Sequence, residues 1–420
     1  MRARRLLGLL ALVTTVGAPR GVSAESPILQ RVAAAGQAAP GGGAFERFSI
    51  EALPVVAPVN SRGQVAFFAT LLRGRAREGF FRATGTRIDA IAAEGDAAPG
   101  GGAFSGFGRH PIPTLNEAGD VAFAAAVSGG KTVEGIFATA GRRLRAVAVA
   151  GSAAPGIASG TLASLDAPAL NDRGDVAFLA TVRRGRESVE AIYLASGATL
   201  SKVVAQGDPA PAGGAFAGFA VPALNNSGTV VFAAVVEGRA VPGGVFVAKG
   251  GRIRMLVGAG DETPVGGIFA KFSERVALND AGAVAFTAAL KEAPTAQAVF
   301  VIEGGRPRKV VALGDGAPGG GIFSHFGLWP ALSASGAVGF TASVDRGAAE
   351  VAAFVSGATG PVRLGAVGDA LPGGGTLSSF GLYPVLALSP SGGATFATAP
   401  TATGEGVEGI FFAPPAALTR

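Results

Sequence analysis

The sequence predicts an all-β fold, a seven-bladed β-propeller with four-stranded blades, from three observations. First, the pattern Asn/Ser-x-x-Gly-x-(Val/Ala)-x-Phe occurs seven times, and its copies start at Asn60, Asn116, Asn171, Asn225, Asn279, Ser333 and Ser389. Second, these copies are 54 to 56 residues apart, a regular period that fits four short strands with their turns. Third, a strand near the N-terminus supplies the piece that the last copy lacks.

The first residues read as a secretory signal peptide, residues 1–24. Arg2, Arg4 and Arg5 form a positive start, residues 6–16 form an apolar core, and Val22-Ser23-Ala24 is a small-residue cleavage site before Glu25. Eleven apolar residues are too few to span a bilayer. We therefore expect an exported protein, periplasmic or extracellular, whose mature chain, residues 25–420, is one propeller domain with no membrane span.

Charge and composition narrow the classes of partner. The formal net charge is +6, but Arg2, Arg4, Arg5 and Arg20 lie in the leader, so the mature chain is near +2 (6 minus 4). This charge is too small for a nucleic-acid-binding surface. Hydrophobic residues make up 49% of the chain, enough for a large core, and Cys 0 excludes disulfides and thiolate chemistry. We expect a monomer.

Each copy of the pattern predicts a hairpin. In Asn116-Glu117-Ala118-Gly119, the Asn suits the start of a tight turn because its side chain bonds its own backbone, and the Gly accepts a positive φ. Apolar residues on either side, 113–115 and 121–123, read as the two strands. We therefore expect the seven Asn and Ser residues to be structural.

The rest of a repeat predicts two further strands and a glycine-rich loop, which makes four strands in all. In the second copy, the loop 95–102 leads into a first strand that runs extended to Leu115, followed by strands at 121–127, 135–137 and 144–149. Both faces of the strand at 121–127 are apolar, so both faces must be covered. Blades arranged radially cover one another in this way.

The two ends of the repeat region predict how the ring closes. Residues 28–33 read as a fourth-type strand with no blade before it, and the last copy stops after its third strand, 409–412. An open solenoid, the second architecture considered, would need polar caps at both ends. A ring closed by the N-terminal strand joining the C-terminal blade needs the arrangement found here.

The repeats resemble a known group of proteins. The Asn-x-x-Gly-x-x-x-Phe copies, with Gly-Asp-x-x-Pro-Gly-Gly-Gly-x-Phe between them, are similar to the bacterial exported "choice-of-anchor tandem repeat" proteins with NxxGxxAF-type repeats, over about residues 27–412. This resemblance implies export and a repeat scaffold. Members of the group often carry a C-terminal sorting segment, which we do not expect here because residues 416–420 carry no sorting signal. The group implies no functional residue.

Five loop carboxylates are the candidate metal ligands: Asp96, Asp208, Asp261, Asp315 and Asp369. Their oxygens are the ligands that calcium prefers. The favoured alternative is that each Asp caps its own loop by accepting backbone N–H bonds. Apart from calcium, we expect no cofactor.

One repeat position varies while its neighbours do not. An anchor twelve residues after the first Gly of the loop is Phe in six copies; the third copy is two residues longer, and its anchor is Leu165. Three residues beyond the anchor, the seven copies carry Glu51, His110, Pro168, Pro222, Arg275, Trp329 and Tyr383. Equivalent positions face the same way around a ring. The ligand-binding candidates are therefore Glu51, His110, Arg275, Trp329 and Tyr383, and the alternative is a loop position that tolerates any residue.

Two functions follow from these features. The favoured one is a non-catalytic scaffold that binds a glycan, a peptide or a protein through one face or the centre of the ring. The alternative is a hydrolase or lyase whose acid and base are a carboxylate and a histidine, such as Glu51 with His110. The sequence favours binding because no blade carries a dense cluster of polar side chains.

Overall fold

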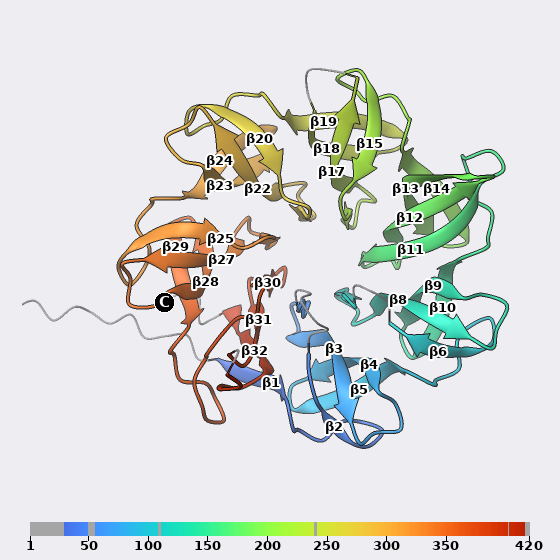
Figure 1. The fold of residues 1–420 in the computed structure, drawn as a ribbon, viewed down its shortest axis with the longest axis horizontal. Coiled ribbons are helices and arrows are strands. Elements are labelled where there is room, and N and C mark those ends of the chain that lie inside the picture. Colours follow the sequence, from blue (N-terminus) through green and yellow to red (C-terminus); the bar gives the residue numbers. More distant parts are fainter. Residues whose placement is uncertain (1–28, 49–54, 108–110, 239–241, 402, 416–420) are drawn as a thin grey trace, which may run out of the picture.

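Seven antiparallel sheets stand in a ring around a common axis (Figure 1). The computed structural model describes residues 29–48, 55–107, 111–238, 242–401 and 403–415. Every regular element in these ranges is a strand. The predicted fold class, an all-β seven-bladed propeller, is therefore confirmed.

The first four blades follow one another along the chain. Blade 1 consists of β2 (Ala44–Phe45), β3 (Gln64–Leu72), β4 (Glu78–Thr84) and β5 (Arg87–Ala93). Blade 2 consists of β6 (Ala103–Gly106), β7 (Thr114–Leu115), β8 (Val121–Ser128), β9 (Glu134–Ala140) and β10 (Arg143–Val149). Blade 3 consists of β11 (Thr161–Leu170), β12 (Val176–Arg184), β13 (Glu187–Ser196) and β14 (Thr199–Ala205). Blade 4 consists of β15 (Ala215–Phe219), β16 (Ala223–Leu224), β17 (Val230–Glu237), β18 (Gly243–Lys249) and β19 (Arg252–Gly258).

The last three blades complete the circle. Blade 5 consists of β20 (Ile268–Phe272), β21 (Ala277–Leu278), β22 (Val284–Lys291), β23 (Gln297–Glu303) and β24 (Arg306–Ala312). Blade 6 consists of β25 (Ile322–Phe326), β26 (Ala331–Leu332), β27 (Val338–Asp345), β28 (Val351–Gly357) and β29 (Gly360–Ala366). Blade 7 consists of β30 (Leu386–Leu388), β31 (Ala394–Thr398), β32 (Gly409–Ala413) and β1 (Gln30–Ala34).

Figure 1 shows β11 and β30, the first strands of blades 3 and 7, beside the axis of the ring. The first strand differs from the expectation of one extended strand. In blades 2, 4, 5 and 6 it is divided into two pieces, which pair with opposite ends of the second strand. In blade 5, residues 273–276 separate the two pieces. The division frees a short segment beside the axis to carry side chains out of the sheet.

The ring closes as predicted. Strand β1 pairs antiparallel with β32, with Gln30 opposite Phe412 and Ala34 opposite Gly409. Blade 7 thus takes three strands from one end of the repeat region and one from the other. A solenoid would leave these two strands in different sheets.

The hydrophobic core lies between blades. Phe123 on β8 is fully buried, and its ring contacts Phe104 and Phe137 of its own blade and Phe80 of blade 1. One continuous cluster of buried residues joins the second and third strands of blade 1 to blade 2. Each blade is therefore covered by its neighbours, which explains why its strands are apolar on both faces. Among the described residues, no helix has the length and apolarity needed to cross a membrane.

Candidate functional site

The seven predicted turns join the first and second strands on one face of the ring. In blade 2, the N–H of Gly119 donates to the carbonyl of Asn116 over 3.0 Å, and Gly119 has a φ of 87°. The Oδ1 atom of Asn116 accepts a bond from the N–H of Asp120 at 2.8 Å. The Asn thus holds its own turn, as the sequence indicated.

The same Asn side chain also joins two blades, which the sequence did not reveal. The Nδ2 atom of Asn116 donates to the backbone carbonyl of Asn171, the equivalent residue in blade 3, over 3.1 Å. The same bond recurs from blade 1 to blade 6, with Asn60, Asn171, Asn225 and Asn279 as the other donors. We call these five residues the asparagine belt. A belt residue needs an acceptor atom and a separate donor atom on one short side chain; an ionised Asp has no donor, and Ser has a single hydroxyl oxygen for both roles.

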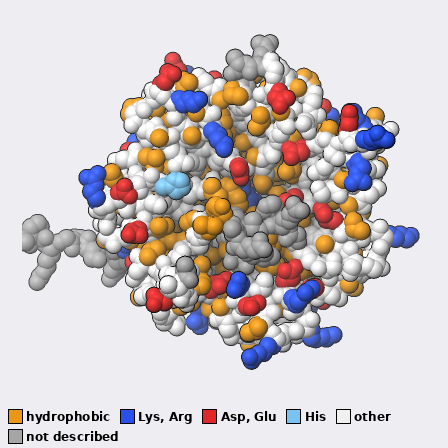
Figure 2. Space-filling view, in the orientation of Figure 1, with side chains coloured by type: hydrophobic (Ala, Val, Ile, Leu, Met, Phe, Trp, Pro, Cys, Tyr) orange, Lys and Arg blue, Asp and Glu red, His pale blue; other side chains and the backbone are white. Residues whose placement is uncertain are grey.

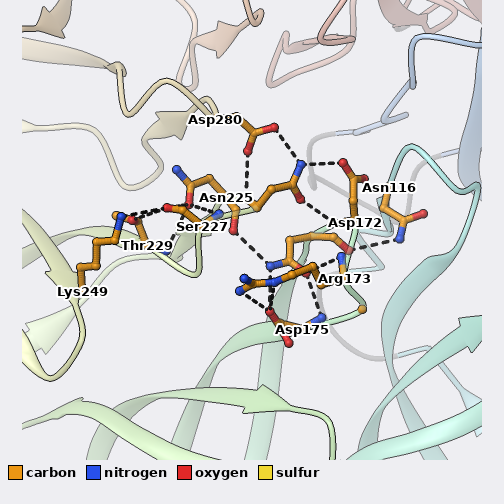
Figure 3. A network of polar contacts seen from close by, with 12 residues as sticks. Asn116, Asp172, Arg173, Asp175, Asn225, Ser227, Thr229, Lys249 and Asp280 are labelled. Carbon is orange, nitrogen blue, oxygen red and sulfur yellow. Dashed lines mark hydrogen bonds and ion pairs between the residues drawn. The ribbon is translucent and has the colours of Figure 1, made fainter.

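A second set of bonds runs beside the belt, through the next residue of each turn (Figure 3). The N–H of Glu117 donates to Asp172 over 2.7 Å, and the N–H of Asp172 donates to Asn226 over 2.7 Å. Asn226 in turn donates through its side chain to Asp172 at 2.5 Å and to Asp280 at 2.7 Å. These exposed carboxylates therefore act as acceptors between blades.

The carboxylate of Asp175 lies under this network. Burial alone would raise the pKa of Asp175, but hydrogen bonds from Ser196, Asn171 and Arg173 outweigh it and lower the pKa below its usual value. The ion pair with Arg173 is 2.8 Å long. Asp175 is thus an ionised structural group.

The five loop aspartates each bond to their own loop. One carboxylate oxygen accepts from the backbone N–H three residues earlier, at 2.7 to 2.9 Å, in Asp96, Asp208, Asp261, Asp315 and Asp369. Asp208 and Asp315 also pair with a lysine, Lys202 and Lys309. Within the described residues, no three His, Cys, Asp or Glu side chains gather as a metal would require. The hydrogen bonds of the five aspartates are those expected of residues that cap their own loops.

The variable position lies on the segments beside the axis. Glu51 and His110 fall outside the described residues. Pro168 lies within β11, and Pro222 lies between β15 and β16. The remaining three candidates belong to blades 5, 6 and 7. We call 273–276, 327–330 and 381–385 the central segments.

The structure brings Arg275 and Trp329 together. The Cζ atom of Arg275 is 5.2 Å from the centroid of the Trp329 ring, which is cation–π contact between adjacent blades. Both side chains are half-buried. Burial lowers the pKa of Arg275 to about 10, and the charge of Asp166 in blade 3 acts in the opposite direction. At neutral pH the guanidinium is charged.

Backbone contacts fix the segment that carries Arg275. Val221 of blade 4 forms a parallel bridge with Arg275, and its N–H donates to the carbonyl of Glu274 over 3.2 Å. The hydroxyl of Ser273 donates to the carbonyl of Arg275 over 2.8 Å. Arg275 is therefore presented from a held backbone.

The central segments of blades 6 and 7 are alike and expose apolar side chains. They read Gly327-Leu328-Trp329-Pro330 and Gly381-Leu382-Tyr383-Pro384. The exposed fractions are 41% for Leu328, 71% for Leu382 and 39% for Tyr383.

These segments lie side by side. The hydroxyl of Thr341 donates to the carbonyl of Pro384 over 2.8 Å, while the N–H of Gly327 donates to the carbonyl of Thr341 over 2.8 Å. Figure 2 shows hydrophobic side chains gathered beside the centre of the ring, on the side where Figure 1 places β25 and β30. We call Leu328, Leu382 and Tyr383 the apolar surface.

Two features of this region were not predicted. Asp166, which affects Arg275, lies in the one repeat that is two residues longer, so alignment of the repeats did not bring it into the column. Trp329 contacts Arg275 by its ring, and no ring contact joins it to Tyr383 among the described aromatic pairs. Repeat spacing gives an angular position around the ring but no side-chain direction.

Comparison with known proteins identifies a family. Residues 59–416 match the model of a family of unknown function, DUF7453. A search of curated proteins gives no match.

Solved structures with a similar course of the chain have different activities. A puromycin-hydrolysing peptidase of Mycobacterium tuberculosis is 13% identical, with a TM-score of 0.48, 89% of this chain covered and 56% of the peptidase. The chain thus spans little more than half of that protein. The polysaccharide lyase Uly1 is 9% identical, with a TM-score of 0.47, 92% of this chain covered and 99% of the lyase. A lectin of Aleuria aurantia is 9% identical, with a TM-score of 0.39, 78% of this chain covered and 99% of the lectin.

Proposed function

The chain belongs to the DUF7453 family, and we propose that it is an exported, non-catalytic β-propeller that binds a ligand on the central segments of blades 5 to 7. The observation that carries the proposal is the apolar surface. Leu328, Leu382 and Tyr383 are half of the large hydrophobic side chains that the described residues expose. They come from equivalent positions of two adjacent blades.

Physical chemistry supports this reading. Exposed apolar area costs about 25 cal/mol per Å² relative to burial, so single exposed leucines are ordinary but a group of them favours an interaction site. An exposed tyrosine adds a flat face and a polar end, a combination typical of binding surfaces. The half-buried Arg275 lies in the neighbouring blade and supplies charge.

Export remains part of this proposal. The leader 1–24, the expected cleavage before Glu25 and the resemblance to the choice-of-anchor tandem repeat proteins support it. Edman sequencing of protein collected outside the cytoplasm should begin at Glu25. The catalytic alternative rests on Glu51 and His110, which lie outside the described residues.

The test is ligand binding followed through the protein's single tryptophan. Glycan and peptide arrays would supply a ligand, and Trp329 fluorescence would follow its titration, since the chain has Trp 1. We expect Leu382→Ser combined with Tyr383→Ser to weaken binding about tenfold or more, as loss of a buried apolar anchor does.

A matched control separates the site from general surface apolarity. Leu72 in blade 1 is 48% exposed, so Leu72→Ser removes an exposed leucine from another part of the surface. It should leave affinity unchanged, and mass spectrometry should recover the ligand intact. Equal effects of the two variants, or a converted ligand, would refute the proposal.

A further inference from the structure

The guanidinium of Arg275 is a charged donor for which the described part of the chain shows no acceptor. Other arginines show the usual arrangement: Arg145 donates to the carbonyl of Gly174 over 2.7 Å, and Arg173 pairs with Asp175 at 2.8 Å. Arg275 contacts the Trp329 ring, and no hydrogen bond or ion pair of its guanidinium is seen among the described residues. A guanidinium carries five N–H groups, so Arg275 has donors available for a ligand.

The ring that Arg275 contacts carries a second unpaired hydrogen-bond donor. The Nε1 atom of Trp329 is buried and has no hydrogen-bond partner among the described residues. A buried unpaired donor costs about 1–3 kcal/mol, so such groups are rare in folded proteins and are concentrated where function requires them. These two donors belong to residues of adjacent blades whose side chains are in cation–π contact. Both would be satisfied by the same chemistry, an acceptor with negative charge.

The local charges fit this requirement. Burial disfavours the charged form of Arg275 and lowers its pKa to about 10, so the fold carries a positive charge at a cost. The nearby carboxylate of Asp166 reduces that cost, while its Oδ1 atom accepts a bond from the N–H of Ala167 over 2.7 Å. A ligand carboxylate would reduce the cost further and form charge-assisted bonds.

The neighbouring surface indicates the kind of molecule that carries the carboxylate. The apolar surface exposes two leucines and one tyrosine, and one of them, Leu328, directly precedes Trp329 in the chain. A glycan would need several polar side chains for its hydroxyl groups, which leucines cannot supply, whereas a peptide brings apolar side chains that leucines pack against. The surface therefore favours a peptide.

We propose that Arg275, held on the Trp329 ring, binds the carboxylate of a peptide ligand whose adjacent apolar side chain packs on Leu328, Leu382 and Tyr383. This inference rests on the proposed function and names its ligand class. In this arrangement Arg275 determines the preference for a carboxylate, and the apolar surface provides most of the affinity.

The experiment compares paired peptides that differ in one charge. The probes are an array of peptides with Leu next to Asp or Glu, each matched by its Asn or Gln counterpart, with oligogalacturonate as the acidic glycan. Binding to the full chain is measured by Trp329 fluorescence. We expect acidic members to bind about tenfold or more tightly than their amide partners, the usual worth of a charge-assisted bond.

Three variants assign the effect. Arg275→Gln should make the affinities of each pair equal while retaining the amide-level binding, and Arg275→Lys should restore part of the preference. Asp166→Asn removes the competing carboxylate and should preserve or increase the preference. Thermal melts of the variants establish that each is folded.

The outcomes separate this inference from the proposed function. Equal binding of both members in the unmodified protein, or a preference that persists in Arg275→Gln, refutes the carboxylate site while leaving the apolar binding surface standing. Binding of oligogalacturonate without any peptide refutes the peptide assignment. If no probe of either class binds, the proposed function itself fails.

Discussion

At the scale of single residues, the asparagine belt shows what a repeat pattern conveys. The recurrence of Asn with a Gly three residues later predicted the turn, because the Asn–backbone bond is local. The bond from Nδ2 of Asn116 to the carbonyl of Asn171 spans 55 residues, and the sequence holds no sign of it. Ser333 and Ser389 keep the local acceptor in blades 6 and 7, where the backbone bond from Ala334 to Pro390 joins the blades.

A substitution in the belt can separate the two roles. Asn116→Asp keeps the Oδ1 acceptor but replaces the donor with an oxygen facing the carbonyl of Asn171. We expect a loss of about 1–3 kcal/mol, since a buried carbonyl loses its partner and faces a like charge. Asn116→Ser, the residue type of blades 6 and 7, should cost less because it keeps an acceptor without adding charge.

Denaturant midpoints measure this comparison best, because a repeat ring need not unfold in two states. A midpoint for Asn116→Asp at or above that of Asn116→Ser would contradict a role for the Nδ2 bond.

The sequence predicted the position of the candidate site along the chain, but it did not predict the contacts between the side chains there. Arg275, Trp329 and Tyr383 were chosen as candidates because the residue type varies at their repeat position, and all three lie on the central segments. The pairing of Arg275 with Trp329 depends on side-chain direction in two different blades. The break in the inner strand that allows this direction has no marker in the sequence, since residues 273–276 are compatible with a strand.

At the scale of elements, a side chain at or near the start of the third strand joins one blade to the next. Its oxygen accepts a bond from the backbone N–H of the anchor residue on the following blade. The pairs are Glu78 with Phe107, Glu134 with Leu165, Glu190 with Phe219, Gln297 with Phe326, and Glu408 with Phe48. The last pair links blade 7 to blade 1. The sequence did not indicate this joint because Gly243 and Val351 occupy the position in the other two blades.

The joint between blades 1 and 2 should depend on pH. Burial raises the pKa of Glu78, and the bond from the N–H of Phe107 opposes this only in part. The folded chain therefore holds the proton more tightly than the unfolded chain, so stability is lost as pH rises through the folded pKa. Glu78→Gln keeps an acceptor oxygen and cannot ionise.

We therefore expect Glu78→Gln to gain stability relative to the unmodified chain as pH rises from about 4 to 7. Gln297→Glu, the reverse change at the equivalent position, should lose stability over the same range. Urea midpoints at several pH values measure both. A difference that does not change with pH would show that Glu78 is not buried against blade 2.

At the scale of the whole molecule, the two ends of the repeat region could be matched from sequence because each lacks what the other has. Strand β1 has no blade of its own, and β32 has an open edge until β1 pairs with it. Both faces of a blade need to be covered by a neighbouring blade. This also predicted a ring, because in a ring every blade has two neighbours. The register between β1 and β32, including its bulge between Arg31 and Ala33, required the structure.

Closure of the ring by β1 and β32 holds blades 5 to 7, and with them the central segments, around one axis. The chain has Cys 0, so introduced cysteines report proximity without background. Gln30→Cys combined with Phe412→Cys places two thiols at paired positions of β1 and β32. Gln30→Cys with Ala138→Cys places the second thiol in blade 2, at the position equivalent to Phe412. After mild oxidation, mass spectrometry of the digested monomer should find a disulfide joining residues 30 and 412 and none joining 30 and 138; a monomer with no link between 30 and 412 would contradict the closed ring.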